Sequence, residues 1–155
     1  MKWLTGFFVI AFAFVSGQAG AAPALEITDG VETLVLDRKE LEALPQTTIR
    51  TVSPYFVGKT EFSGPTLQHV VEHFGASGAT NITLTALNDY SVAGGFDEVL
   101  SMDAVVATRR NGDTMTVRQR GPFWVILPLS DRPDLDNQSY HQFMVWQLNR
   151  IELTR

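Results

Sequence analysis

Apolar and polar residues alternate in short runs along most of the chain, and this pattern predicts many short strands. Residues 25–36 ("LEITDGVETLVL") form two such runs around Asp29-Gly30, which indicates an opening hairpin. Residues 47–52 ("TTIRTV") and 81–87 ("NITLTAL") predict further strands. Residues 105–119 predict a hairpin with Asn111-Gly112 at its tip, and the apolar run 123–129 ("FWVILPL") is typical of a strand buried on both faces.

Helical signals are confined to two short segments. Asp37 is a typical N-cap for a helix over 37–44, with Glu40 three residues later as a capping box. A second helix is expected over 65–74, with Pro65 in its first turn and Gly75 as its C-cap. The stretch 140–154 is expected to begin as a helical turn and end as a strand. The pattern therefore predicts a single α+β domain with β-rich mixed sheets and a few short helices.

The first 21 residues are typical of a secretory signal peptide. Lys2 precedes an apolar run from Trp3 to Val15, and small residues at 19–21 or 20–22 suit cleavage. The run is shorter than the roughly 20 residues of a membrane-spanning helix, although an uncleaved anchor is the alternative. We therefore expect residues 1–21 to be a signal peptide and residues 22–155 to form an exported, periplasmic domain that does not itself span a membrane.

Composition narrows the chemistry further. The chain has no cysteine, which excludes disulfides and thiolate metal ligands. Its net charge of −5 and the lack of a Lys/Arg block argue against a nucleic-acid partner, because phosphate binding needs clustered cations.

Motifs of common enzymes are missing from the sequence. His69 and His73 lie four residues apart on the second predicted helix, a spacing that suits one metal ion, but no third ligand is indicated and two solvated histidines are the alternative. The chain contains no G-x-S-x-G nucleophile motif. "AGGF" (93–96) lacks the rest of a phosphate-binding loop, and the adjacent Asp97 and Glu98 would point to opposite faces of a strand.

Three features remain as candidates for a binding site. Asn88, Asp89 and Tyr90 end a predicted strand and either line a crevice or simply form a turn. Trp124 stands just inside the apolar run 123–129, as a core residue or as a stacking surface for a flat ring. The segment 140–146 is rich in aromatic side chains, which suits a core corner or a pocket for a planar ligand.

Five segments in order resemble the oxidoreductase molybdopterin-binding domain of the sulfite oxidase type. They are "FSGPTL" (62–67), "NDY" (88–90), "RNGDTM" (110–115), "GPFWVILP" (121–128) and "VWQLNRIEL" (145–153). The resemblance covers nearly all of residues 22–155, and it implies the fold of that domain.

Two departures from the enzymes stand out. The resemblance places Thr51 where they carry the cysteine that ligates molybdenum, and Phe143 and Trp146 about where they carry basic residues for the cofactor phosphate. In the enzymes a soft thiolate completes the coordination of molybdenum. The lack of that cysteine therefore implies a non-catalytic protein. The alternative is a molybdopterin-dependent oxidoreductase subunit.

The chain is more similar to small exported regulators of the PruR type, through the Trp after "G-P-x" and through "VWQL". That resemblance implies a reduced pterin as ligand, without metal. It also implies a partner, the periplasmic domain of a membrane-bound enzyme of cyclic di-GMP turnover.

Applied to this sequence, the pterin hypothesis assigns a role to each candidate residue. Trp124 would be the stacking platform, with Tyr55 or His141 on the opposite face of the ring. Asp89 would accept hydrogen bonds from the amino edge, and Asn88 would meet the carbonyl side. Thr51 and Ser53 would bond the ring's outer nitrogens, and Tyr90 would line the crevice together with Asn88 and Asp89.

Overall fold

The structure, a computed structural model, describes residues 22–155. The predicted signal peptide, and its alternative as a membrane anchor, lie outside the described residues. Across 22–155, none of the helices combines the length and the apolar character needed to cross a membrane.

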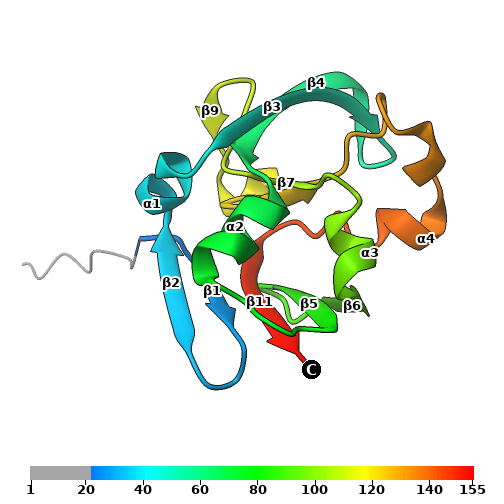
Figure 1. Ribbon diagram of the computed structural model, residues 1–155. Coiled ribbons are helices and arrows are strands. Elements are labelled where there is room, and N and C mark those ends of the chain that lie inside the picture. Colours follow the sequence, from blue (N-terminus) through cyan, green and yellow to red (C-terminus); the bar gives the residue numbers. More distant parts are fainter. Residues whose placement is uncertain (1–21) are drawn as a thin grey trace, which may run out of the picture.

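Short strands dominate the described part of the chain, as predicted, and short helices connect them (Figure 1). The strands are β1 (Ala24–Thr28), β2 (Thr33–Asp37), β3 (Gln46–Ser53), β4 (Phe56–Pro65), β5 (Asn81–Ala86), β6 (Ser91–Gly95), β7 (Val105–Ala107), β8 (Arg109–Arg110), β9 (Asp113–Thr114), β10 (Trp124–Ile126) and β11 (Leu148–Thr154). The α-helices are α1 (Arg38–Ala43), α2 (Leu67–Phe74), α3 (Phe96–Leu100) and α4 (Gln138–His141), and the 3₁₀ turns are η1 (Val117–Gln119) and η2 (Pro133–Leu135).

The strands form three sheets. A five-stranded sheet has the order β2-β1-β11-β5-β6, in which β1 runs parallel to β11 and the other pairs are antiparallel. A four-stranded sheet has the order β3-β4-β8-β9, and its long β3–β4 hairpin arches over the top of the molecule in Figure 1. Between them lies the pair β10-β7, whose side chains are all buried. The side chains facing inward from these sheets form one hydrophobic core.

Helix α2 confirms most of its sequence prediction. Its apolar face (Leu67, Val70 and Val71) is buried in the core. Gly75 ends the helix in the left-handed conformation (φ 79°), as a C-cap glycine is expected to do. The start of the helix differs from the prediction, because Pro65 is the last residue of strand β4. Thr66 is the N-cap, and its hydroxyl accepts a hydrogen bond from the His69 backbone N–H.

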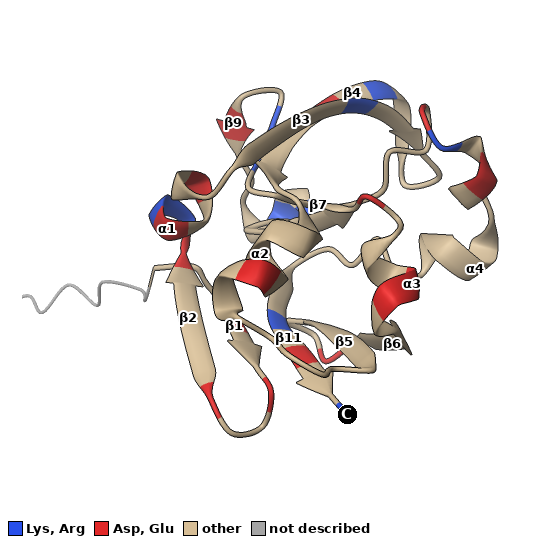
Figure 2. Cartoon of the chain, viewed as in Figure 1, with Lys and Arg blue, Asp and Glu red and all other residues tan. Residues whose placement is uncertain are grey.

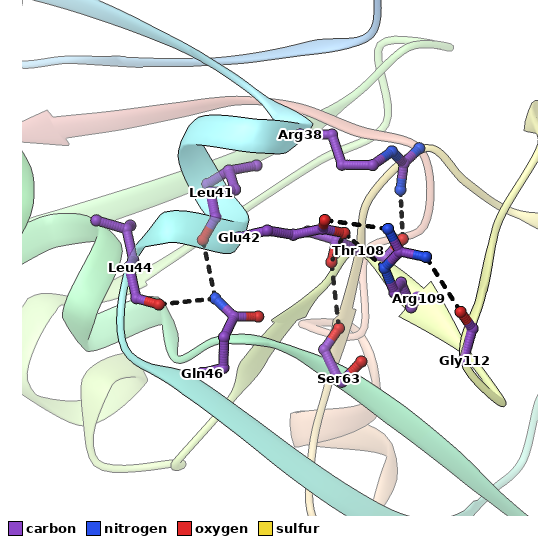
Figure 3. Close-up of polar contacts among 9 residues, drawn as sticks. All are labelled: Arg38, Leu41, Glu42, Leu44, Gln46, Ser63, Thr108, Arg109 and Gly112. Atoms are coloured by element: carbon purple, nitrogen blue, oxygen red, sulfur yellow. Dashed lines mark hydrogen bonds and ion pairs between the residues drawn. The ribbon is translucent and has the colours of Figure 1, made fainter.

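Helix α1 begins with the predicted capping box of Asp37 and Glu40 and is then anchored to β8. The Glu42 carboxylate accepts two hydrogen bonds from the Arg109 guanidinium (2.8 and 3.1 Å) and one from the Thr108 hydroxyl (3.0 Å) (Figure 3). Arg38 donates to the Thr108 carbonyl from the same helix. This network ties helix α1 to strand β8 of the four-stranded sheet. Figure 2 shows that α1 carries both signs of charge, whereas α3 carries acidic residues.

Two strand predictions were too long. The hairpin at Asn111-Gly112 exists, with positive φ at both residues, but β8 and β9 have only two residues each. Residues 105–107 pair with β10 instead, and 117–119 form a 3₁₀ turn. In the run 123–129 every residue is buried, yet only Trp124–Ile126 is a strand.

A glycine lets two of these sheets approach closely. A Cβ atom on Gly64 would lie 2.0 Å from the carbonyl oxygen of Val106. Only the absence of a side chain allows β4 to pass β7 at this distance. The packing explains why "FSGPTL" needs its glycine.

Candidate ligand-binding site

A cavity of about 210 Å³ lies where three separate parts of the chain meet, and we call it the Tyr55–Trp146 cavity. One part is the β3–β4 turn, the second is the end of β5 with the turn to β6, and the third joins α4 to β11. Its lining residues are Tyr55, Ala86, Asn88, Tyr90, His141, Gln142, Met144, Val145 and Trp146. Because drug-sized ligands occupy pockets of about 300–1,000 Å³, this cavity suits a smaller molecule.

Two aromatic rings form one wall of the cavity. The Tyr55 ring meets the Trp146 indole edge to face, with centroids 5.2 Å apart and an interplanar angle of 72°. The Tyr55 hydroxyl donates to the His141 carbonyl at 3.2 Å, which ties the β3–β4 turn to the end of α4. Burial raises the pKa of the Tyr55 phenol, the nearby Tyr90 raises it further, and the Arg120 cation opposes both. Tyr55 is therefore a neutral phenol at ordinary pH.

The β5–β6 turn supplies the polar side of the cavity. The Asn88 side-chain oxygen accepts from the Tyr90 backbone N–H at 3.2 Å, and the Tyr90 hydroxyl donates to the Gln142 carbonyl at 3.0 Å. Within the described chain, the Asn88 amide nitrogen has no protein partner. It is therefore a donor that a ligand can use.

His141 lines the cavity from the end of α4. Its Nε2 atom lies 2.8 Å from Asp136 Oδ1, and its side chain is only 17% exposed. The carboxylate fixes the orientation of the ring, so the imidazole is held in place beside Tyr55.

Trp124 is a core residue, and the predicted stacking platform at this position is wrong. The side chain is 0% exposed and its indole N–H donates to the Met144 carbonyl at 3.2 Å. Phe56 and Phe62 pack edge to face against it. Trp146, which forms an isolated β-bridge with Trp124, presents its indole to the cavity instead.

Thr51 and Ser53 are engaged by the protein and do not line the cavity. The Thr51 hydroxyl is buried; it accepts from the Ser130 N–H at 3.0 Å and donates to the Val52 carbonyl at 3.1 Å. Ser53 Oγ accepts from the Tyr55 N–H at 3.1 Å and lies 4.0 Å from the Met144 sulfur. The role predicted for both was bonding to a ligand's outer nitrogens. Instead, Thr51 ties β3 to Ser130, and Ser53 fixes the β3–β4 turn.

The predicted "NDY" segment is divided between two roles. Asn88 and Tyr90 line the cavity, whereas Asp89 is exposed, has φ 64° and uses its backbone N–H to close the turn onto Ala86 at 3.0 Å. Left-handed φ is tolerated by Asp in turns. Asp89 is thus a turn residue outside the cavity lining, contrary to its predicted contact with an amino edge.

The two helix histidines do not form a metal site. Over residues 22–155, no group of three or more His, Asp or Glu side chains gathers to hold a metal ion. His73 is exposed, and His69 is half-buried with its Nδ1 atom lacking a partner in the described chain.

Phe143, one of the two aromatic residues at positions where the enzymes carry basic residues, is a core residue. It is 6% exposed, and its ring packs so close to Gly94 that a Cβ atom there would clash with it.

Arg120 is the residue at this site that the sequence did not single out. Its guanidinium carbon lies 5.1 Å from the Trp146 ring centroid, 5.2 Å from that of Trp124 and 5.8 Å from that of Tyr55. The available signal in the sequence was a basic residue directly before "GPFW". The other two aromatic residues that Arg120 contacts, Tyr55 and Trp146, lie in distant segments. That signal has meaning only once the fold brings those segments together.

Comparisons with known proteins place the fold. Neither a family model nor a curated protein matches the chain. Among solved structures, the crystal structure of the sulfane dehydrogenase SoxCD from Paracoccus pantotrophus is similar, with a TM-score of 0.64 at 15% sequence identity. The similarity covers 85% of this chain but only 38% of that chain.

The fold is of the sulfite oxidase molybdopterin-domain type. This confirms the fold class predicted from the sequence. At 15% identity the similarity concerns the fold alone, and this chain spans well under half of the length of the SoxCD chain.

The donor set at Thr51 does not fit molybdenum. The resemblance places a thiolate ligand at this position, but the hydroxyl found here is a hard donor and is already bonded to Val52 and Ser130. The Tyr55–Trp146 cavity, in contrast, is lined by aromatic side chains and by Asn88.

Proposed function

We propose that this protein is a non-catalytic receptor for a reduced pterin, which it holds without metal in the Tyr55–Trp146 cavity. The observation that carries the proposal is the cavity itself, which is lined both by the Tyr55–Trp146 wall and by Asn88 of the polar β5–β6 turn. A pterin has two flat faces for the wall and an edge rich in hydrogen-bonding atoms for the turn.

The contacts available are of the right strength for such a ligand. Stacking of a flat base on an aromatic side chain contributes about 1–3 kcal/mol. Asn88 and the His141 ring add hydrogen-bonding groups, each contributing about 1 kcal/mol net. Micromolar binding needs about −8 kcal/mol in all, so stacking, two or three hydrogen bonds and burial of the ring faces together are sufficient.

The second part of the proposal is a relay: the loaded protein docks on the periplasmic domain of a membrane-bound enzyme of cyclic di-GMP turnover. Exposed apolar side chains near the cavity support a docking role. Leu87 and Tyr90 lie on the β5–β6 turn, Val57 follows Tyr55 by two residues, and Val117 accepts from Gln147 through its carbonyl. Export to the periplasm through residues 1–21 belongs to the same proposal.

Extraction of the native protein tests the ligand. The protein is purified from the periplasmic fraction, and its small-molecule content is measured by fluorescence and mass spectrometry. We expect about one pterin per chain in the wild type, a strongly reduced content in Trp146→Leu, and an unchanged content in Tyr140→Leu, a half-buried aromatic outside the cavity lining. A wild type that carries no pterin and binds none when it is added contradicts the proposal.

Metal analysis separates this function from the competing one, a molybdopterin-dependent oxidoreductase subunit. Stoichiometric molybdenum in the purified protein would favour the enzyme. Pterin without molybdenum is the result that we expect, because the Thr51 hydroxyl is occupied by protein partners.

A further inference from the structure

Arg120 lies behind the aromatic wall of the cavity, and no part of the proposed binding mode uses it. Its guanidinium carbon is within 6 Å of the Trp146, Tyr55 and Trp124 ring centroids, as given above. Arg120 itself does not line the cavity. The cation therefore contacts the rings of the wall without lining the cavity itself.

The position of Arg120 is fixed from three directions. Its Nη1 donates to the Tyr55 carbonyl at 2.8 Å, its backbone carbonyl accepts from the Gln147 N–H at 2.9 Å, and its own N–H bonds to Val117. Its backbone is in the left-handed region with φ 71°, which costs a non-glycine residue free energy. One residue thus links the turn that carries Tyr55 to the segment that carries Trp146.

The charge of Arg120 is not neutralised by a neighbouring carboxylate. Within residues 22–155, no Asp or Glu oxygen lies within the 4 Å of an ion pair with Arg120. Asp136 is paired with the lining residue His141. Asp89 is exposed on its turn, outside the lining.

An unpaired cation behind an aromatic wall affects which rings the wall attracts. The electron-rich face of the indole is already polarised toward the guanidinium, so the cavity side is less attractive to a second cation. The Coulomb repulsion acts in the same direction. Because Tyr55 and Trp146 are only partly buried, added salt screens this repulsion. The field favours a ligand that is neutral or negatively charged.

We propose that Arg120 is the selectivity residue of this cavity: it positions the Tyr55–Trp146 wall and makes the site prefer flat heterocycles that are neutral or carry an anionic group over cationic ones. The inference rests on the proposed function and adds the charge class of the ligand. Arg120 is a positioning residue, since it acts on the ligand through the rings.

The test compares three probes of one ring system: pterin, 6-carboxypterin and a pterin that carries a 6-trimethylammoniomethyl group. Dissociation constants are measured by fluorescence titration of the purified protein. We expect the wild type to bind the carboxylate about tenfold more tightly than the cation at low salt. Arg120→Met, which removes the charge but keeps an unbranched chain, should reduce this ratio to about twofold.

Two controls address the wall and the general charge of the surface. Arg118→Met removes an exposed cation from η1 two residues away and should leave the ratio unchanged. Arg120→Lys keeps the charge and should keep most of the ratio, even where a looser wall weakens all three probes. Raising the salt from about 20 mM to about 500 mM should shrink the ratio in the wild type, which needs no variant to fold.

The outcomes separate this inference from the function beneath it. If the wild type binds pterin but shows no preference between the charged probes, or if Arg120→Met keeps the full ratio, the role of Arg120 is overturned and the receptor stands. If the wild type binds none of the probes and also carries no reduced pterin when it is purified, the proposed function fails and the inference fails with it.

Discussion

Tyr55 and Trp146 stand 91 positions apart in the sequence, yet their rings meet edge to face at 5.2 Å and form one wall of the cavity. Such pairs contribute about 0.5–1.5 kcal/mol beyond the area they bury. The tyrosine reaches this position from the β3–β4 turn and the tryptophan from the segment before β11. The wall is therefore a product of chain topology rather than of a local motif.

Trp146→Leu should weaken pterin binding about 5- to 150-fold, because it removes a stack of about 1–3 kcal/mol. The dissociation constant is measured by fluorescence titration with added pterin. Tyr140→Leu is the matched control and should change it less than twofold. Equal weakening in both variants would show that the loss is a general effect of the aromatic-rich segment.

Trp124→Ala should destabilise the fold by about 3–5 kcal/mol, since a buried large aromatic leaves a cavity. The free energy of unfolding is measured by urea denaturation. The protein that remains folded should still bind pterin, and its affinity should fall only to the extent that the loss of Trp124 displaces the Tyr55–Trp146 wall. Full loss of the ligand at unchanged stability would restore Trp124 as a direct ligand contact.

Thr51→Val should destabilise the protein by about 1–3 kcal/mol. Valine has nearly the same shape but leaves the Ser130 N–H without its acceptor, which costs its desolvation. Urea denaturation measures the change, and Thr48→Val, an exposed position on the same strand, is the control. Similar values for both variants would mean that the Thr51 hydroxyl bond contributes little.

Glu42→Gln should remove part of the protein's loss of stability in acid. The hydrogen bond from Arg109 is the main reason why the pKa of Glu42 lies below its ordinary value of 4.5, and the Thr108 hydroxyl lowers it further. A lowered folded pKa means that the carboxylate stabilises the fold fully above pH 4.5 and stops doing so as the pH falls through the folded value.

The measurement for Glu42 is the melting temperature as a function of pH. The wild type should be more stable than Glu42→Gln at neutral pH, and the difference should shrink below pH 4.5. Glu61→Gln, an exposed carboxylate on β4, serves as the control and should run parallel to the wild type. A constant difference across the acid range would contradict the role given to the Arg109 pair.

The local order of the fold could be read from the sequence because its signals are local. The capping box at Asp37, the left-handed Gly75 and the Asn111-Gly112 turn all depend on residues within a few positions of one another. Strand ends were read less well. The buried run at 123–129 shows only that its residues are apolar, while the partner strand β7 decides that pairing stops at Ile126.

The binding site divides in the same way. The sequence alone identified the β5–β6 turn, His141 and Tyr55 as candidates, and all of these except Asp89 line the cavity. Trp124 and Trp146 both follow apolar residues in the sequence, so the local pattern does not distinguish them. Only the tertiary structure, in which the two residues pair across one β-bridge, shows that Trp124 is buried and Trp146 faces the cavity. It also placed the Arg120 guanidinium against both rings. The burial of Trp124 and the position of the Arg120 charge depend on contacts between segments that are far apart in the sequence. A local sequence pattern does not predict such contacts.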